Sequence, residues 1–328
     1  MRLKNIVTIG GGTGSFMLLS GLKKYPVNIS AIVSMADDGG STGMLRDELG
    51  VLPPGDVRQC LVALSESSET LRKLMNYRFK QGGLKGHNFG NIFLSALEKV
   101  SGNFEKGVEE ASKILNIKGK VIPVINKSVR MHIKLKNGKI IIGENNLDHN
   151  EEIRRIGLEK IFLKPIVPAN RKALEKIKKA DLIIIGPGDY YGSIMPNLLA
   201  KNIPEAINNS RARIIYVCNL TNKKGQTDNF SLEKYTSEIN KMLGSSKIDT
   251  VIFNNKKINP SLIKKYETRE GKSSVVKKME EVKLRYKIIE ADIIRNIRIE
   301  AIKNGQSFIR HDSDKLAKVI MKIMNKKI

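Results

Sequence analysis

The sequence predicts an α/β protein with a doubly wound, mostly parallel, Rossmann-like sheet and a small β excursion. Three observations predict this fold. Strand and helix patterns alternate over the first 120 residues, buried apolar runs of the parallel-sheet type return after residue 180, and short β runs separate these two stretches. No repeat and no Pro/Gly/Ser-rich linker divides the chain. We therefore expect a single domain over residues 1–328, with the β excursion at about 118–150.

The elements follow one another in a regular order. Residues 6–10 and 28–36 are expected to form buried strands, and apolar residues at helical spacing predict helices within 57–65, 69–79, 90–100 and 107–117. The excursion contains Asn137-Gly138, a hairpin signal, between two β runs. Further buried strands are predicted within 180–186, 212–220 and 248–255, and a capped final helix follows Asp312 or Ser313.

Composition limits the classes of function. The formal net charge of +25 would attract a polyanion, but the chain has no Trp and only 5% aromatic residues, so platforms for stacking bases are scarce. This argues against nucleic acid as the partner. No apolar run approaches the roughly 20 residues of a membrane span. Two cysteines, Cys60 and Cys218, are too few for a disulfide framework, so we expect a cytoplasmic protein.

A glycine-rich turn follows the first predicted strand. Residues 6–15 read IVTIGGGTGS, and absent side chains let backbone N–H groups approach a phosphate at the start of the next helix. The candidate residues are Gly11, Gly12, Thr13 and Gly14. The dinucleotide motif fails because Ser15 stands where its third glycine belongs, and no lysine ends a phosphate loop before Lys23. A plain strand–helix turn is the alternative.

A second polar segment follows the second strand. Asp37 and Asp38 could coordinate Mg²⁺ or hydrogen-bond a ribose, with a helix cap or turn as the alternative. Gly39 and Ser41 belong to a flexible stretch rich in donors, which we expect to face the first glycine turn. Arg46 is either a phosphate partner or part of a surface salt bridge with Asp47 or Glu48. Asp56 is expected to cap the next helix.

Three further candidate segments contribute side chains. His87 and Asn91 lie at the start of a predicted helix, where a histidine could polarise a phosphate or serve a structural role. After the strand at 180–186, Gly188 offers a backbone donor, Tyr191 could pack on a base, and Asn197 could bond a sugar or base edge. Asn219, Thr227 and Asp228 follow the next strand. Polar loops at several strand ends predict one ligand site at the carboxyl edge of the sheet.

Several of these motifs together resemble the gluconeogenesis-factor (YvcK-like) family. The motifs are GGGTG, ADDGGSTGMLRDELGVLPPGDVRQCLVALS, GHNFGN, GPGDYYGS, GQTDNFS and IRHDSDKLA, in the family's order from residue 6 to about 320. That family is related to the 2-phospho-L-lactate transferases (CofD-like). The resemblance departs at 225–229, where this chain reads Gly-Gln-Thr-Asp-Asn and the family commonly has Gly-Glu-Thr-Asp-Gly.

The resemblance implies a cytoplasmic protein that binds a UDP-sugar, typically UDP-N-acetylglucosamine, and links gluconeogenic growth to cell shape and wall synthesis. We expect a binding protein rather than an enzyme, with a Mg²⁺-dependent transferase of the 2-phospho-L-lactate type as the alternative. An unidentified cell-wall or metabolic protein is the expected partner, and a homo-oligomer stays open. The pocket residues implied by the resemblance are Gly11 to Gly14, Asp37, Asp38, Gly188, Asp189, Asn219, Tyr266 and Arg310.

Overall fold

The chain is built on a seven-stranded parallel sheet. The computed structural model describes residues 2–245, 247–272, 274–279, 284–296 and 309–325. The strand order is β10-β9-β8-β7-β1-β2-β3. The strands are β1 (Lys4–Gly10), β2 (Val27–Val33), β3 (Lys120–Pro123), β7 (Leu182–Ile185), β8 (Arg213–Val217), β9 (Thr250–Asn254) and β10 (Lys287–Ala291). The predicted doubly wound, mostly parallel α/β fold is confirmed.

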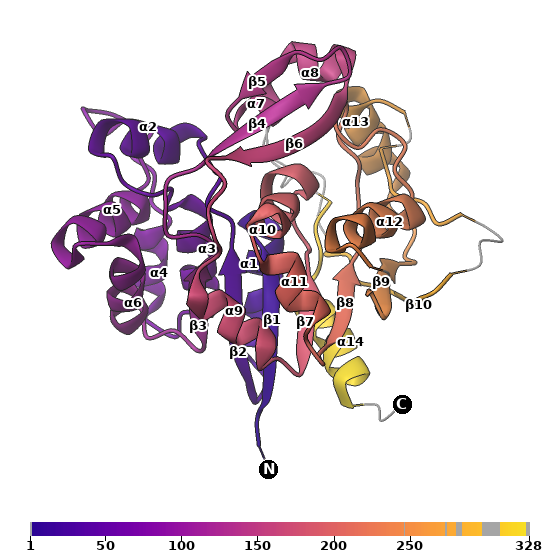
Figure 1. Cartoon of the computed structure of the whole chain (residues 1–328), viewed down its shortest axis with the longest axis horizontal. Coiled ribbons are helices and arrows are strands. Elements are labelled where there is room, and N and C mark those ends of the chain that lie inside the picture. The colour runs from indigo at the N-terminus through magenta and orange to yellow at the C-terminus, as the bar shows by residue number, and fades with distance from the viewer. Residues whose placement is uncertain (1, 246, 273, 280–283, 297–308, 326–328) are drawn as a thin grey trace.

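Helices form a layer on each face of this sheet (Figure 1). From β1 the chain moves to β2 on one side, whereas from β7 it moves to β8 on the other. Right-handed crossovers in opposite directions place their helices on opposite faces. The helices are α1 (Gly12–Leu22), α2 (Gly40–Leu49), α3 (Gly55–Leu64), α4 (Glu69–Met75), α5 (Phe89–Ser101), α6 (Phe104–Ile114), α9 (Arg171–Lys178), η1 (Tyr190–Ile194, a π-helical turn), α10 (Met195–Leu199), α11 (Ile203–Asn208), α12 (Leu232–Leu243), α13 (Pro260–Glu270) and α14 (Ser313–Asn325).

A second, antiparallel sheet lies above the carboxyl ends of the parallel strands (Figure 1). We call residues 130–164 the antiparallel lobe. Its strands have the order β5-β4-β6, and it also contains two short helices. Its elements are β4 (Arg130–Leu135), β5 (Ile140–Ile142), α7 (Asn146–His149), α8 (Glu151–Ile156) and β6 (Leu158–Lys164). The predicted hairpin at Asn137-Gly138 joins β4 to β5.

The bounds of the lobe differ from the expected 118–150. Residues 120–123 form β3, which pairs in parallel with β2 at the edge of the main sheet. The lobe continues to residue 164 because β6 returns to pair with β4. A short apolar run does not reveal by itself which sheet it joins, since the pairing partner lies far away in sequence.

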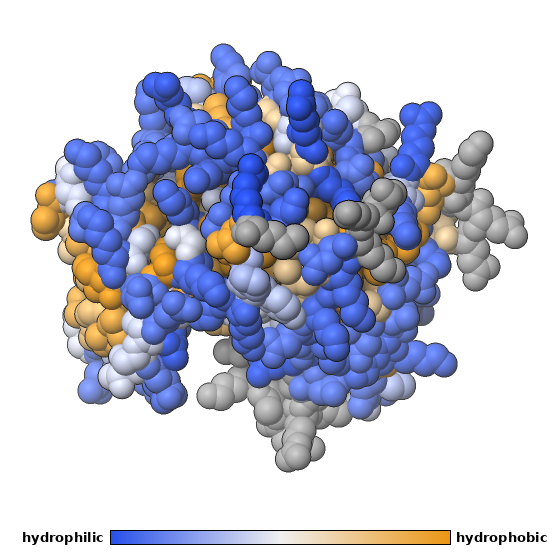
Figure 2. Space-filling model, turned by 90° about the horizontal axis from the view of Figure 1, so that it is seen from below, coloured by the Kyte–Doolittle hydropathy of each residue, from blue (hydrophilic) through white to orange (hydrophobic). Residues whose placement is uncertain are grey.

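The two faces of the sheet share one apolar core, and the surface is largely polar. Strand β7 is buried at every position, as a central parallel strand requires. Figure 2 shows the molecule from below, where hydrophilic residues prevail and apolar residues gather at the left, on the side of α4, α5 and α6. Val100 and Ile114, on this side, are among the exposed large apolar residues. Within the described part of the chain, every helix is too short or too polar to cross a lipid bilayer.

The packing of α1 against α14 generates a stability prediction. A Cβ atom added at Gly21 in α1 would lie 2.0 Å from the backbone oxygen of Ser313. We expect Gly21→Ala to destabilise the fold by about 1–3 kcal/mol, because two helix backbones must separate. Gly83→Ala is the control, since a Cβ there has no neighbour within 4 Å. Urea unfolding of both variants measures the difference, and equal stabilities would contradict the expectation.

Candidate functional site

The glycine turn predicted from the sequence joins β1 to α1 at the carboxyl edge of the sheet. Gly11 precedes the helix in an extended conformation, and Gly12 has a φ of +61°, which favours glycine. A Cβ on Gly11 would lie 2.0 Å from Oδ2 of Asp56, and one on Gly14 would lie 2.4 Å from the carbonyl oxygen of Pro187. Close approach of neighbouring chain segments therefore requires glycines here, whatever ligand binds.

The segment after β2 contains a helix where the sequence suggested a flexible stretch. Gly39 is the residue before α2, and Ser41 lies in its first turn, so the expectation of a loop facing the glycine turn is wrong. The Asp37 side chain accepts a hydrogen bond from the Gly39 amide (3.0 Å). Asp38 instead accepts a bond from the Asn145 amide (2.7 Å) and lies 3.5 Å from Arg46. The two carboxylates therefore have different partners.

Four candidate residues lie in α2 or at the start of α5, where they bond to neighbouring groups. The Ser41 hydroxyl accepts a hydrogen bond from the Asn88 amide and lies 3.5 Å from Nδ1 of His87. The Asn91 amide oxygen accepts a bond from Arg58 (2.9 Å). Arg46, whose side chain is 5% exposed, pairs with Asp47 as well as with Asp38. Arg46 thus pairs with Asp47, but it is buried rather than at the surface. None of Ser41, Arg46, His87 and Asn91 lines the cavity described below.

The loop after β7 is fixed by its own polar side chains. Asp189 caps η1, because its Oδ1 accepts a hydrogen bond from the Gly192 amide (2.7 Å). Asn197 is fully buried and donates to the carbonyl oxygens of Gly10 and Ser193, which ties this loop to β1. Tyr191 is buried and packs edge-to-face on another tyrosine ring. Tyr191 and Asn197 thus shape the loop from behind and do not line the cavity.

The loop after β8 contains the remaining predicted side chains. Asn219 donates to the carbonyl oxygen of Gly188 (2.9 Å) and so joins two strand-end loops. The Thr227 hydroxyl accepts a hydrogen bond from the Lys223 amide (2.9 Å). Asp228 accepts two bonds from the Gly225 amide and stabilises the turn rather than the cavity wall.

A cavity of about 480 Å³ opens where these loops meet. It lies between the ends of β1 and β7, the point at which the connections of the sheet reverse direction, and ligands of doubly wound sheets bind at this point. Nine predicted residues line it: Gly12, Thr13, Gly14, Gly188, Asp189, Asn219, Thr227, Tyr266 and Arg310. Lining residues that the sequence did not indicate include Asp148, His149, Arg154, Lys223, Gln226, Arg269, Glu270 and His311.

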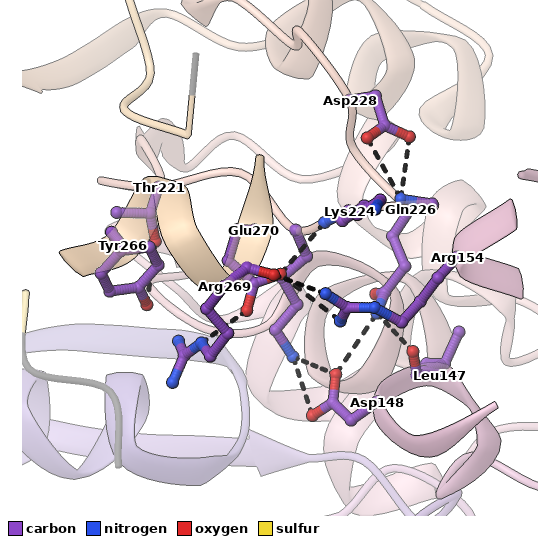
Figure 3. A network of polar contacts seen from close by, with 12 residues as sticks. Leu147, Asp148, Arg154, Thr221, Lys224, Gln226, Asp228, Tyr266, Arg269 and Glu270 are labelled. Atoms are coloured by element: carbon purple, nitrogen blue, oxygen red, sulfur yellow. Dashed lines mark hydrogen bonds and ion pairs between the residues drawn. The ribbon is translucent and has the colours of Figure 1, made fainter. Parts of the chain in front are cut away.

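One wall of the cavity is a network of polar side chains between the lobe and α13 (Figure 3). Arg154 of the lobe donates to the backbone oxygen of Arg269 (2.5 Å) and lies 3.8 Å from Glu270. The Arg269 guanidinium lies 4.7 Å from the centre of the Tyr266 ring, within cation–π range. Arg310 enters the same cavity just before α14, whose amides are capped by Asp312 as predicted.

Buried carboxyl groups surround the glycine turn. Asp56 does not cap α3 as expected; it accepts a hydrogen bond from the Gly12 amide. Burial, together with the charge of Asp37, raises the pKa of Asp56 to about 8. Burial and the charges of Asp37 and Asp189 likewise raise the pKa of Glu144, which belongs to the lobe. Near neutral pH Asp56 retains its proton, so the site is less negative than its formal charges suggest.

The arrangement bears on the predicted Mg²⁺ site. Within the described ranges, no group of three or more His, Cys, Asp or Glu side chains is placed to hold a metal ion. Mg²⁺ commonly uses one or two carboxylates and completes its shell with water and substrate phosphates. Asp37 remains a candidate for that role, whereas Asp38 already contacts Arg46 and the Asn145 amide; neither residue lines the cavity.

The lining residues that the sequence missed come mostly from the lobe and α13. His311 is buried, burial lowers its pKa to about 4, and its ring is therefore neutral at pH 7. Among these missed residues, Lys223 is the one that the sequence could have indicated most directly, because it follows Asn219 in the same strand-end loop. Arg154 and Glu270 had no such signal: they reach the cavity only through the folding of elements remote in sequence.

Fold and site together define a doubly wound α/β protein with a polar ligand cavity at the topological switch point. The family model described as "2-phospho-L-lactate transferase CofD" matches residues 6–294. The gluconeogenesis factor of Halalkalibacterium halodurans is 39% identical over 98% of this chain and 97% of its own length. That of Bacillus subtilis is 38% identical over 97% of this chain and 98% of its own.

A solved structure agrees with these sequence relationships. The crystal structure of a UPF0052 family member from Bacillus halodurans has a TM-score of 0.88 at 38% identity, covering 98% of this chain and 99% of that one. The chain belongs to the CofD family and, within it, to the gluconeogenesis factors.

The buried Asp56 generates a pH prediction. Because its pKa is raised on folding from an ordinary value near 3.8 to about 8, the folded state holds a proton that the unfolded chain releases. The corresponding stabilisation is complete below pH 4 and is lost as the pH rises to 8. Asp56→Asn imitates the protonated form. We expect its free energy of unfolding to rise relative to that of the wild type by on the order of 1 kcal/mol for each pH unit in that interval. Urea unfolding between pH 5 and 8 measures it; parallel curves would disprove the assignment.

Proposed function

We propose that this protein is a cytoplasmic regulatory protein that binds a UDP-sugar, with UDP-N-acetylglucosamine as the leading ligand. Occupancy of the site would link gluconeogenic growth to cell shape and wall synthesis through a protein partner. One observation carries the proposal: the cavity joins a glycine turn at a helix start to a wall containing Tyr266 and Arg310. Its volume of about 480 Å³ falls within the usual range of small-molecule sites.

The two ends of the cavity suit the two kinds of group in a nucleotide-sugar. At the glycine end, Gly12, Thr13 and Gly14 begin the 11-residue helix α1, whose positive end favours a diphosphate. At the other end, the cavity is lined by Tyr266, whose ring stacks with the Arg269 guanidinium, and by Arg310, whose guanidinium is a planar donor. If Mg²⁺ binds with the ligand, Asp37 would hold it, and it would neutralise phosphate charge there.

A transferase of the 2-phospho-L-lactate type is the second candidate. The description of the matching family favours it, because that description names the transferase and the match spans residues 6–294. Such an enzyme must also hold a large planar deazaflavin acceptor. The chain is poor in aromatic residues, and the tyrosines that line the cavity, Tyr190, Tyr235 and Tyr266, are all buried side chains with little exposed ring surface. We therefore place the binding function first.

Ligand choice separates the two candidates. UDP-N-acetylglucosamine should raise the melting temperature more than NAD or ATP, with a stabilisation that grows with concentration and reaches about 2.7 kcal/mol at 100 times Kd. Each nucleotide is measured by thermal shift with and without Mg²⁺. Strongest stabilisation by GTP, with transfer from a lactyl-phosphate donor, would favour the transferase. If no nucleotide shifts the curve, both candidates fail.

Arg310 tests the position of the ligand. Arg310→Ala should weaken UDP-sugar binding by tenfold or more, and Arg310→Lys should weaken it less, because lysine keeps the charge but loses the planar fork. Isothermal calorimetry measures the affinities. Arg211→Ala is the control, since Arg211 is exposed and lies outside the cavity lining. Unchanged affinity in both Arg310 variants would remove this residue from the site.

A further inference from the structure

Lys223 connects the cavity to the antiparallel lobe. Its ammonium contacts both carboxylate oxygens of Asp148, in α7 of the lobe, at 2.7 and 3.0 Å. It also forms an ion pair with Oδ2 of Asp189, at the start of η1. Burial alone would lower the pKa of Lys223, but the charges of Asp189 and Asp148 more than offset it and raise that pKa above its usual value. The side chain is therefore charged at any physiological pH.

The same ammonium faces the glycine end of the cavity. Lys223 lines the cavity together with Gly12 and Gly188, and 35% of its side chain is exposed. An ammonium has three protons, and here three carboxylate oxygens lie against it. A phosphate oxygen that enters the cavity can bind Lys223 only by replacing one of these three contacts.

Asp148 is the partner that gives way most easily. Its side chain is 54% exposed, so water can solvate the carboxylate once Lys223 leaves it. Asp189 is only 23% exposed, and its other oxygen is held by the Gly192 amide. Displacing Asp189 would leave a largely buried carboxylate without its cation and would disrupt the cap of η1. This costs more free energy than releasing Asp148.

We propose that Lys223 is shared between the ligand and the lobe: it binds the phosphate groups of the ligand, and in doing so releases Asp148 and loosens α7. This inference rests on the proposed function, since it requires an anionic, phosphate-bearing ligand. It adds a phosphate-binding residue and a route by which occupancy changes the surface of the protein.

The release is confined to one end of the lobe. The other end, α8, is held to α13 by Arg154, which bonds the backbone of Arg269 and lies near Glu270 (Figure 3). At α7, the remaining described side-chain bonds from the loop after β8 are those of Gln226, to the carbonyl oxygen of Leu147 (2.7 Å) and to Asp148 (3.3 Å). Ligand binding should therefore expose residues 145–149 and leave 151–156 unchanged.

Hydrogen exchange measured by mass spectrometry tests this movement in the full chain. UDP-N-acetylglucosamine and, separately, inorganic pyrophosphate are added to the wild type. We expect exchange at 145–149 to rise at least twofold with either probe, and exchange at 151–156 to stay constant. Increased protection at 145–149, or no change while the probe is bound, would overturn the inference.

Three variants give the energetic test. Asp148→Asn frees Lys223 and should tighten binding of both probes about three- to tenfold, while abolishing their effect on exchange. Lys223→Gln should weaken binding at least tenfold. Lys139→Gln is the matched control, because Lys139 is a lysine of the same lobe whose ammonium pairs with Glu152 and does not line the cavity. Asp148→Asn that binds no tighter than wild type would overturn the inference even if Lys223→Gln fails to fold.

The two probes keep the inference distinct from the proposed function. Binding of the UDP-sugar without any response at 145–149 overturns the inference and leaves the function standing. If pyrophosphate binds with the expected response but no UDP-sugar binds, the proposed function is overturned and the inference stands. If neither probe binds, both fall.

Discussion

The close approach of three chain segments at the carboxyl end of β1 is the constraint on which the rest of the site depends. Gly11 touches Asp56, and Gly14 touches the backbone at Pro187, with no room for a Cβ at either position. Asn197, buried behind them, bonds the carbonyl oxygen of Gly10. These contacts fix the start of α1 against the loop after β7, so the helix amides face the cavity in one orientation. A phosphate site built on backbone donors requires this rigidity.

The charges of the site are balanced within the protein. Burial raises the pKa of Asp56 to about 8, so a proton neutralises this carboxyl group near neutral pH, and burial with neighbouring charges also raises the pKa of Glu144. The ammonium of Lys223 compensates Asp189 and Asp148. In the same network of polar contacts, Arg154 lies near Glu270 (Figure 3). An anionic ligand therefore enters a cavity whose cations already have partners, and binding must exchange these partners rather than add to them. Through this exchange, ligand binding can change the contacts of the antiparallel lobe.

The sequence predicted the elements well and the contacts between them less well. Buried apolar runs and glycine turns are local signals, and they located the parallel strands β1, β2, β7, β8 and β9 and the loops after β1, β7 and β8. Strand β3 was assigned to the excursion instead, and β10 was not predicted. The start of α2 was mistaken for a loop because Gly39, Gly40 and Gly43 weaken its helical pattern; a Cβ at Gly43 would lie 2.1 Å from the backbone oxygen of Asp38. Asp56 was assigned a cap because its contact with Gly12 is tertiary. Arg154 and Glu270 had no local signal, since α8 and α13 meet only in the folded chain.

The structure gives a physical reason for the effect of glutamine at position 226, where the chain departs from the family pattern. The family resemblance leads us to expect glutamate at the position where this chain has Gln226. The Gln226 amide donates to the carbonyl oxygen of Leu147 and to Asp148 (3.3 Å), two acceptors that an ionised carboxylate would repel. Glutamate could make the same bonds only when protonated. With glutamine, the link between the loop after β8 and α7 does not titrate, and one carboxylate fewer surrounds Lys223. The contact between the loop after β8 and α7 therefore depends on the ammonium of Lys223 and on the neutral amide of Gln226. An entering phosphate group competes only for Lys223 and leaves the amide bonds of Gln226 in place.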